Sequence, residues 1–548
     1  MTVLLFTGIG SGKQSIQSKT QPPPATGMKR IPIKPNTNKS PLKGWTLGLA
    51  ALGLVSLGAP APAAEPGTNA PPAAAAQPYG KKADKGFFKR LNEAFAEQNG
   101  NAVYTAPKPG DPPPPPRRIG PQPFDGPPFP TGDWQIGGGP NVIGDPGALR
   151  DNPYPLMQAI YDGPGGKAWY DSRIQLYGWE TISGNLSTSR NTAKGQAANF
   201  PEIYDERPNR VEQEQFVLYL ERMADESQTD HVDWGFRFAG VYGLDYRFMS
   251  TRGFLSNQLY GNNVSSQTTA NPVIRNNYYG YDLPMMYANV YIPWVAQGMN
   301  IILGRIISEP DIEQQLAPNN LMASHSILYG FDNYTMWGLW TTTKLNANWT
   351  VQAGIADGVD IAPWQNDVGR QVTGSLMIQW ISSGGHDSWY AGMNSLNNGN
   401  FGYNNLQESI ASYTHKFNEK WWTTFEGQFM YTKNASTAPT YQVPYQDGFF
   451  PSHGGFVSEG GILNYTMRRL ADNAFLTIRN EWYDDPAGAR TGASTSYYEG
   501  SVGITWWANK LLVLRPEIRF EHSFQQPSFD NYTRKSQVTL ATDVTYHF

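Results

Sequence analysis

The chain has 548 residues, is rich in glycine (56) and in aromatic side chains (17 Trp, 30 Tyr, 25 Phe), and is only 16% charged. It contains no cysteine, which excludes disulfide bonds, thiolate metal sites and a cysteine nucleophile. Residues 1–64 hold seven of the 42 basic residues and no acid. The remainder therefore carries 35 basic against 46 acidic residues, without a basic stripe that would bind nucleic acid.

The N-terminal residues have the pattern of an export leader. Five basic residues between positions 29 and 43 precede an apolar stretch over 45–57, and residues 61–64 are small enough for a cleavage site. The apolar stretch is shorter than the roughly 20 residues that a membrane helix needs. We therefore expect a leader with a signal peptide over 1–64, and Met28 is the better candidate for its true start.

Residues 65–170 are expected to form an extended arm, because proline-rich runs at 112–116 and 121–130 favour polyproline II over a packed core. One segment, 85–98, places apolar side chains at helical spacing: Phe87, Phe88, Leu91, Ala94 and Phe95. This spacing predicts a short amphipathic helix. The helix either lies on a barrel or membrane surface or binds a specific partner.

From residue 171 onward, segments of about 10–14 residues alternate apolar and polar side chains, as strands do when one face contacts lipid. In 535–548, Leu540, Val544, Tyr546 and Phe548 share one face. In 510–523, the apolar face opposes a row of alternating Arg and Glu. The pattern predicts sixteen strands, near 172–185, 212–223, 232–247, 285–294, 299–307, 334–345, 349–359, 371–382, 387–396, 406–417, 420–432, 459–470, 473–485, 495–507, 510–523 and 535–548.

Two further features favour a membrane barrel over a soluble sandwich. Short connections such as 418–419 and 508–509 alternate with long ones such as 248–284 and 308–333, as in barrels with short periplasmic turns and long outer loops. Tryptophans cluster at strand ends, where an aromatic girdle is expected: Trp294, Trp349, Trp421, Trp422, Trp506 and Trp507. We therefore expect an all-β fold: a transmembrane antiparallel β-barrel of about sixteen strands over 171–548, behind a Pro-rich periplasmic arm.

Several stretches resemble the OmpL-like β-barrel porin family over roughly 170–548. They are NFPEIYDERPNR (199–210), TDHVDWGFR (229–237), YIPWVAQGMN (291–300), LAPNN (316–320) and RPEIRFEH (515–522). The resemblance implies an outer-membrane barrel of Gram-negative bacteria and a porin role. The last strand looks like a signal read by the barrel assembly machinery, carried by Leu540, Val544, Tyr546 and Phe548.

If the apolar faces contact lipid, the opposite faces line a lumen. The candidate pore-lining residues are Arg237, Arg247, Arg305, Arg479, Glu481, Arg515, Glu517, Arg519 and Glu521. Charges at such positions either tune which ions pass or pair with each other and brace the wall, and one ladder can do both.

The segment 309–318 lies in the long connection after the fifth strand, in the place of the inward-folded constriction loop of trimeric porins. Glu309, Asp311 and Glu313 are therefore expected to face the basic wall across the pore. The alternative is an ordinary outer loop with solvated acids or a weak calcium site.

These observations predict passive diffusion of small hydrophilic solutes through a charged aqueous pore. Two alternatives stay open. One is a structural or adhesive barrel with a plugged lumen, and the other is a substrate-specific channel whose inward aromatics stack on sugars: Tyr177, Tyr219, Tyr287 and Tyr291. None of the seven histidines lies in a nucleophile elbow or zinc motif, so we expect no enzyme, metal or cofactor. The expected partners are outer-membrane lipid, the assembly machinery, the solutes and, as an open possibility, two further copies in a homotrimer.

Overall fold

The computed structural model describes residues 79–100, 150, 152–191, 197–226, 228–258, 279–307, 312–365, 371–384, 386–399, 405–418, 420–435, 454–471 and 473–548. The expected leader and both proline-rich runs lie outside the described residues.

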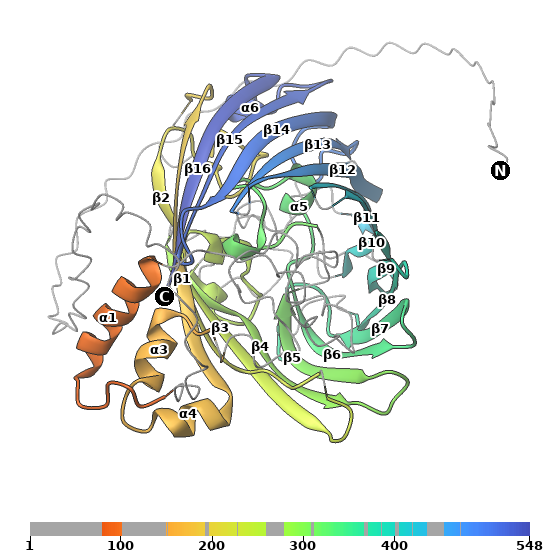
Figure 1. Cartoon of the computed structure of the whole chain (residues 1–548). Coiled ribbons are helices and arrows are strands. Elements are labelled where there is room, and N and C mark those ends of the chain that lie inside the picture. The colour runs from red at the N-terminus through yellow and green to blue at the C-terminus, as the bar shows by residue number, and fades with distance from the viewer. Residues whose placement is uncertain are drawn as a thin grey trace, which may run out of the picture. The chain divides into compact units, whose positions relative to one another are not determined.

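Sixteen antiparallel strands of the described residues form one closed barrel (Figure 1). The first eight are β1 Ile174–Ser187, β2 Val211–Arg222, β3 Asp233–Gly243, β4 Gly280–Ile292, β5 Met299–Ile307, β6 Thr335–Lys344, β7 Trp349–Ala356 and β8 Thr373–Ile381. The others are β9 Asp387–Leu396, β10 Gln407–Asn418, β11 Trp421–Ala435, β12 Gly455–Ala471, β13 Ala474–Asp485, β14 Thr495–Trp507, β15 Leu512–Ser523 and β16 Ser536–His547. Each strand pairs with its neighbours in sequence, and β1 pairs with β16, which confirms the predicted sixteen-stranded barrel.

Burial along the strands is the reverse of that in a soluble protein. On β16, Leu540 is 49% exposed and Val544 38%, whereas Asp543 between them is 2% exposed. Soluble proteins bury apolar side chains and expose carboxylates, whereas a barrel in lipid presents its apolar face outward. The two-residue repeat thus places apolar groups on the outer surface and polar groups inside.

The barrel closes where β1 meets β16, in a register that runs from Trp179 opposite His547 to Ser187 opposite Thr539. Phe548 continues this ladder, because its N–H donates to the carbonyl of Gly178 at 2.9 Å. A Cβ on Gly178 would lie 2.0 Å from the carbonyl oxygen of Val217 and 2.9 Å from the ring of Phe548. Glycine at 178 therefore permits the close approach of β1 and β2 beside the closing strand.

The third strand is shorter than predicted. β3 ends at Gly243, and a 3₁₀ helix, η2 (Asp245–Phe248), follows. Gly243 has φ +147°, and a Cβ there would lie 2.1 Å from the carbonyl oxygen of Glu214. The prediction of a strand through Arg247 was wrong, because the backbone leaves the ladder at this glycine.

The predicted tryptophan girdle also needs correction. Trp506 is 46% exposed on the outer face, but Trp507 is 3% exposed and Trp422 fully buried. Successive side chains on a strand point to opposite faces, so neighbouring tryptophans on one strand cannot both face lipid. Trp507 instead stacks on His547 inside, with ring centroids 5.5 Å apart.

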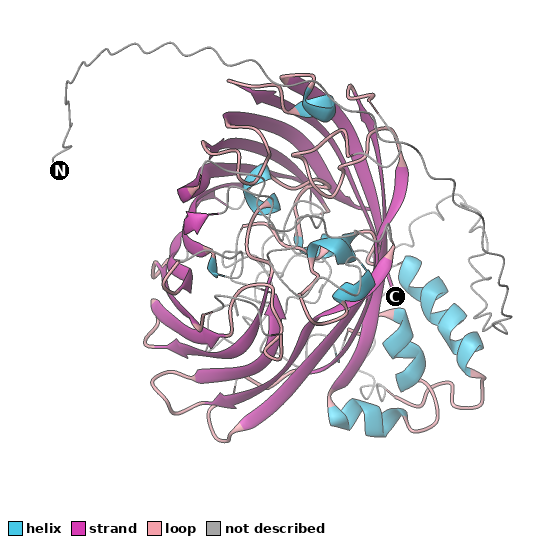
Figure 2. Cartoon of the chain, turned by 180° about the vertical axis from the view of Figure 1, so that it is seen from behind, coloured by secondary structure: helices cyan, strands magenta, loops and turns pink. Residues whose placement is uncertain are grey.

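Three helices precede the barrel, α1 (Phe87–Asn99), α3 (Pro155–Tyr161) and α4 (Gly166–Ser172), and α1 covers most of the segment expected to be helical (Figure 2). Phe95 of α1 stacks on Tyr546 of β16, with centroids 5.9 Å apart. Tyr154, just before α3, stacks on His547 at 5.1 Å. None of the helices in the described part of the chain is long and apolar enough to span a membrane.

Two long connections pack against the inner wall. The connection between β5 and β6 contains η4 (Ala317–Asn319) and α5 (Ile327–Gly330), and its described residues 312–334 are called the inner loop below. Figure 1 shows α5 inside the ring of strands, and it contacts β12 and β13. The inner loop meets the connection between β1 and β2, where Phe331 packs edge-on against Phe200 at 6.1 Å. The short remaining helices are η3 (Ser256–Gln258) and α6 (Phe529–Tyr532).

Candidate functional site

The candidate site is the inner wall of β12 to β16 together with the inner loop that it holds. Glu481 of β13 accepts hydrogen bonds from the backbone N–H groups of Ile327, at 2.8 Å, and Leu328. Glu517 of β15 accepts from the N–H groups of Ala323 at 3.0 Å and Ser324 at 3.1 Å. Two wall carboxylates therefore bind the backbone of a segment more than 150 residues away in the chain.

Arginines of the same wall bind the loop's carbonyl oxygens. Arg515 donates to Asn320 O at 2.8 Å and to Ala317 O, and its guanidinium pairs with Asp543 of β16. Arg519 donates to the carbonyl of His325 and pairs with Glu521 at 2.6 Å. Each guanidinium thus joins a wall carboxylate to the loop backbone.

One ion pair connects the loop to the wall by side chains. Glu313 lies 3.1 Å from Arg479 and accepts hydrogen bonds from the N–H of Ser326 at 3.0 Å and from the hydroxyl of Tyr465. Arg479 also pairs with Glu499 of β14 at 3.0 Å. Glu313 is therefore held against the basic wall, and its role in a constriction stays a prediction. Glu309 and Asp311 lie outside the described residues.

The other candidate pore-lining residues lie on the opposite part of the barrel. Arg237 pairs with Glu221 at 2.6 Å, and Arg305 pairs with Asp282 at 2.8 Å. Arg247 lies on η2, not on a strand, and pairs with Glu206. All nine candidates are buried, and their contacts fit the bracing role, whereas their role in ion passage stays a prediction.

The strands carry more inward acids than the three glutamates predicted to line the pore. Buried charged residues on the described strands comprise fourteen acids and five arginines, and β6 to β9 contribute none of them. The arginines are Arg237, Arg305, Arg479, Arg515 and Arg519, and the acids are Glu212, Glu214, Glu221, Asp233, Asp282, Glu408, Glu426, Glu459, Glu481, Asp485, Glu499, Glu517, Glu521 and Asp543. The two-residue alternation could have revealed Glu499 and Glu426, because each directly follows an outward aromatic residue, Tyr498 or Phe425.

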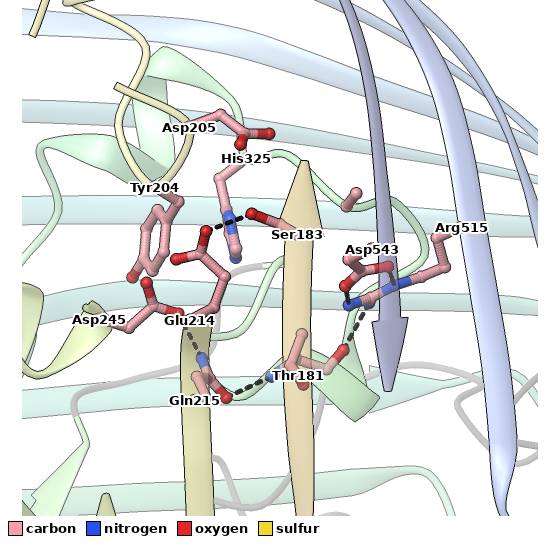
Figure 3. Close-up of a pocket in the computed structure, with 12 residues that line it drawn as sticks. Thr181, Ser183, Tyr204, Asp205, Glu214, Gln215, Asp245, His325, Arg515 and Asp543 are labelled. Carbon is pink, nitrogen blue, oxygen red and sulfur yellow. Dashed lines mark hydrogen bonds and ion pairs between the residues drawn. The ribbon is translucent and has the colours of Figure 1, made fainter. Parts of the chain in front are cut away.

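A cavity of about 20 Å³ lies between the inner loop and β1, β2, β15 and β16, with room for about one water molecule. Four carboxyl groups line it, as Figure 3 shows: Asp205, Glu214, Asp245 and Asp543, of which Asp543 pairs with Arg515. Ser183 donates to Glu214, and Gln215 donates to Asp245 at 2.8 Å. Burial raises the pKa of Asp205 and that of Asp245 to about 7. Both hydrogen bonds come from neutral side chains, so they add no positive charge beside Glu214 and Asp245.

His325 of the inner loop also lines this cavity. Its Nε2 lies 2.8 Å from the carbonyl oxygen of Gln314, and its ring stacks on Tyr204 at 4.1 Å. Burial lowers the pKa of His325 to about 3, because a charged imidazolium would lose its hydration there. The neutral ring is therefore part of the packing of the loop.

The inward tyrosines contact each other. The rings of Tyr177 and Tyr219 stack at 5.1 Å with an interplanar angle of 1°, and Tyr154 lies 6.0 Å from Tyr177. Tyr291 is fully buried, and Tyr287 is 8% exposed. Among the described residues, no group of three or more His, Asp or Glu side chains is arranged to hold a metal ion.

The model of the family described as "Putative beta-barrel porin-2, OmpL-like" matches residues 174–548. No curated protein matches the chain. Solved structures with a similar fold include an anion-selective porin from Comamonas acidovorans, at 11% identity and a TM-score of 0.43, covering 68% of this chain and 99% of that one.

Two further structures are similar over the same share of the chain. The outer-membrane channel DcaP of Acinetobacter baumannii has 9% identity and a TM-score of 0.40, with 97% of its chain covered. The trimer form of OmpT from Vibrio cholerae has 9% identity and a TM-score of 0.39, with 99% covered. At these identities the likeness concerns the fold alone.

Proposed function

Because the chain belongs to the OmpL-like β-barrel porin-2 family, and is thus a non-enzymatic outer-membrane porin, we propose that it lets small hydrophilic solutes diffuse passively through its lumen. The observation that carries this proposal is the division of the wall into an apolar outer face and a polar, charged inner face. On β15, Ile518 is 48% exposed to the outside, whereas Arg519 beside it is fully buried on the inner side. A wall of this kind separates hydrocarbon from a polar interior.

The inner loop is the proposed constriction. It leaves the wall after β5 and reaches β13 to β15, where Glu313 pairs with Arg479. Opposed charges at a narrow point set a transverse field and influence which solutes pass. We propose Glu309 and Asp311, which lie outside the described residues, as the other acids of this constriction.

Liposome swelling tests the proposal. The purified full chain, reconstituted into liposomes, should admit small sugars and amino acids at rates that fall with solute size. Equal exclusion of every solute, in liposomes whose protein is folded, would contradict passive diffusion.

A sealed structural or adhesive barrel is the second candidate, and one observation favours it. The inward side chains on the described strands are largely buried, and the cavity beside the inner loop holds only about 20 Å³. Such a barrel would resist heat in detergent as a folded β-barrel yet leave liposomes impermeable. The sugar-specific channel has no such support, because Tyr177 and Tyr219 use their ring faces on each other.

Two partner proposals accompany the porin role. Leu540, Val544 and Tyr546 lie on the outer face of β16, and Phe548 stacks on Phe216 at 5.3 Å, which supports an assembly signal accessible from outside. Replacing these apolar residues with Ser should lower insertion into the outer membrane. A homotrimer of this chain is likewise proposed, and chemical cross-linking in native membranes tests it.

A further inference from the structure

The inner wall carries a surplus of negative charge. The described strands bury fourteen acids and five arginines. Four further arginines pair with these acids: Arg173 and Arg222 with Asp233, Arg207 with Glu212 and Arg490 with Glu459. The fourteen acids therefore outnumber these nine arginines by five. Each of the nine arginines has an acid within ion-pair distance, for example Arg305 with Asp282 at 2.8 Å. Pairing therefore uses up the positive charge and leaves the carboxylates in excess.

Glu408 of β10 illustrates how the surplus is held. Its carboxylate accepts hydrogen bonds from the side-chain amides of Asn333 at 2.7 Å, Asn394 at 2.5 Å and Gln428 at 2.7 Å. No described lysine or arginine lies within ion-pair distance of it. Amide groups satisfy the oxygens but carry no net charge, so the negative charge of this group remains.

The arginines of the wall that binds the inner loop do not outnumber its acids. On β13 to β15, Arg479, Arg515 and Arg519 face four glutamates: Glu481, Glu499, Glu517 and Glu521. Glu481 and Glu517 bind neutral backbone N–H groups of the inner loop. The narrowest proposed part of the pore therefore shares the negative sign of the whole wall.

We infer that this pore prefers cations to anions, an inference that rests on the proposed porin function. Charges inside a low-dielectric wall act on passing ions over a Debye length, which is about 8 Å at physiological salt. They attract counter-ions and repel co-ions. A mean potential of about one kT would enrich cations and deplete anions each e-fold, which gives a permeability ratio of about seven.

The reversal potential tests this inference. The purified full chain is reconstituted in a planar bilayer at pH 7.5 with a tenfold KCl gradient, and the potassium-to-chloride permeability ratio is calculated from single open channels. The expected ratio is above one, of the order of seven, and it should rise further at lower salt, because screening weakens. A ratio at or below one, or a ratio that does not respond to salt, would overturn the inference while leaving the porin function intact. Absence of open channels from a folded barrel would instead count against the proposed function.

A matched pair of variants assigns the effect to the lumen. Glu408→Gln removes one of five surplus charges and should lower the ratio by about a third, if the potential scales with that surplus. Glu180→Gln makes the same chemical change on β1, at a partly exposed side chain that accepts a hydrogen bond from Gln213 at 2.7 Å. This control should keep the wild-type ratio. Equal ratios for both variants would overturn the assignment to the luminal carboxylates, and the salt series on the wild type decides the inference if Glu408→Gln does not fold.

Discussion

Replacing Glu313 with Gln should release the inner loop from the wall. The change keeps the shape of the side chain but removes its negative charge. That charge pairs with Arg479 at 3.1 Å, and the carboxylate accepts a hydrogen bond from the N–H of Ser326 at 3.0 Å. Arg479 keeps its ion pair with Glu499 at 3.0 Å in this variant, so the substitution does not leave the buried guanidinium without an acid. Hydrogen bonds to charged groups contribute about 1.5–3 kcal/mol each, so we expect a net loss of about 2–3 kcal/mol.

This loss of free energy determines how many molecules have a detached inner loop. A loss of about 2–3 kcal/mol raises the fraction of molecules with a detached loop by about 30- to 150-fold. If the loop is the constriction, single-channel recordings of Glu313→Gln should show more frequent events of higher conductance than the wild type. Limited proteolysis should cleave within 312–334 faster.

The control is Glu180→Gln, which carries the same isosteric change away from the loop and should behave as the wild type. Wild-type conductance and open-channel noise in Glu313→Gln, together with faster proteolysis, would show that the loop moves without narrowing the pore. Unchanged proteolysis and unchanged conductance would refute the ion pair as the attachment of the loop.

Three further predictions follow from buried groups. The pKa of His325 lies well below its ordinary value. The stability due to its neutral ring is therefore present above about pH 6.5 and is lost as the pH falls toward 3. Denaturation at several pH values should show this loss in the wild type but not in His325→Asn. Gly178→Val should reduce the fraction of heat-modifiable folded barrel, whereas Gly240→Ala, with 3.6 Å to the nearest side chain, should not. Tyr154→Ala removes the ring contacts with His547 and Tyr177 and should weaken the attachment of the N-terminal helices to the barrel by about 3 kcal/mol. Protease should then release 79–172 faster than from the control Tyr532→Ala, which changes a tyrosine remote from those helices.

The strands could be predicted from the sequence because the side chains along each strand alternate between two environments. On β15, lipid outside and polar groups inside require alternation over the whole strand, and the register then follows from short turns such as 508–509. The same alternation places the neighbouring Trp506 and Trp507 on opposite faces, although their clustering suggested an aromatic girdle for both. The end of β3 was harder to predict, because it depends on the close approach of Gly243 to Glu214 of another strand.

The contacts of the inner loop could not be derived from sequence. Glu313 and Arg479 are 166 positions apart, and they meet only because the barrel brings β5 and β13 around a common interior. The placement of the loop after the fifth strand predicted that Glu313 would face basic residues, but not that Glu481 and Glu517 would bind backbone N–H groups. The helices α3 and α4 were also unforeseen, since they are short and lie in a segment whose composition indicates an extended arm.

The claim that a polar interior connects the two sides of the membrane is tested most directly by the current through single molecules. The purified, heat-modifiable barrel should produce discrete steps in a planar bilayer, and their size should increase with KCl concentration. A folded barrel that inserts into the bilayer and remains silent at every voltage and salt concentration would contradict the account.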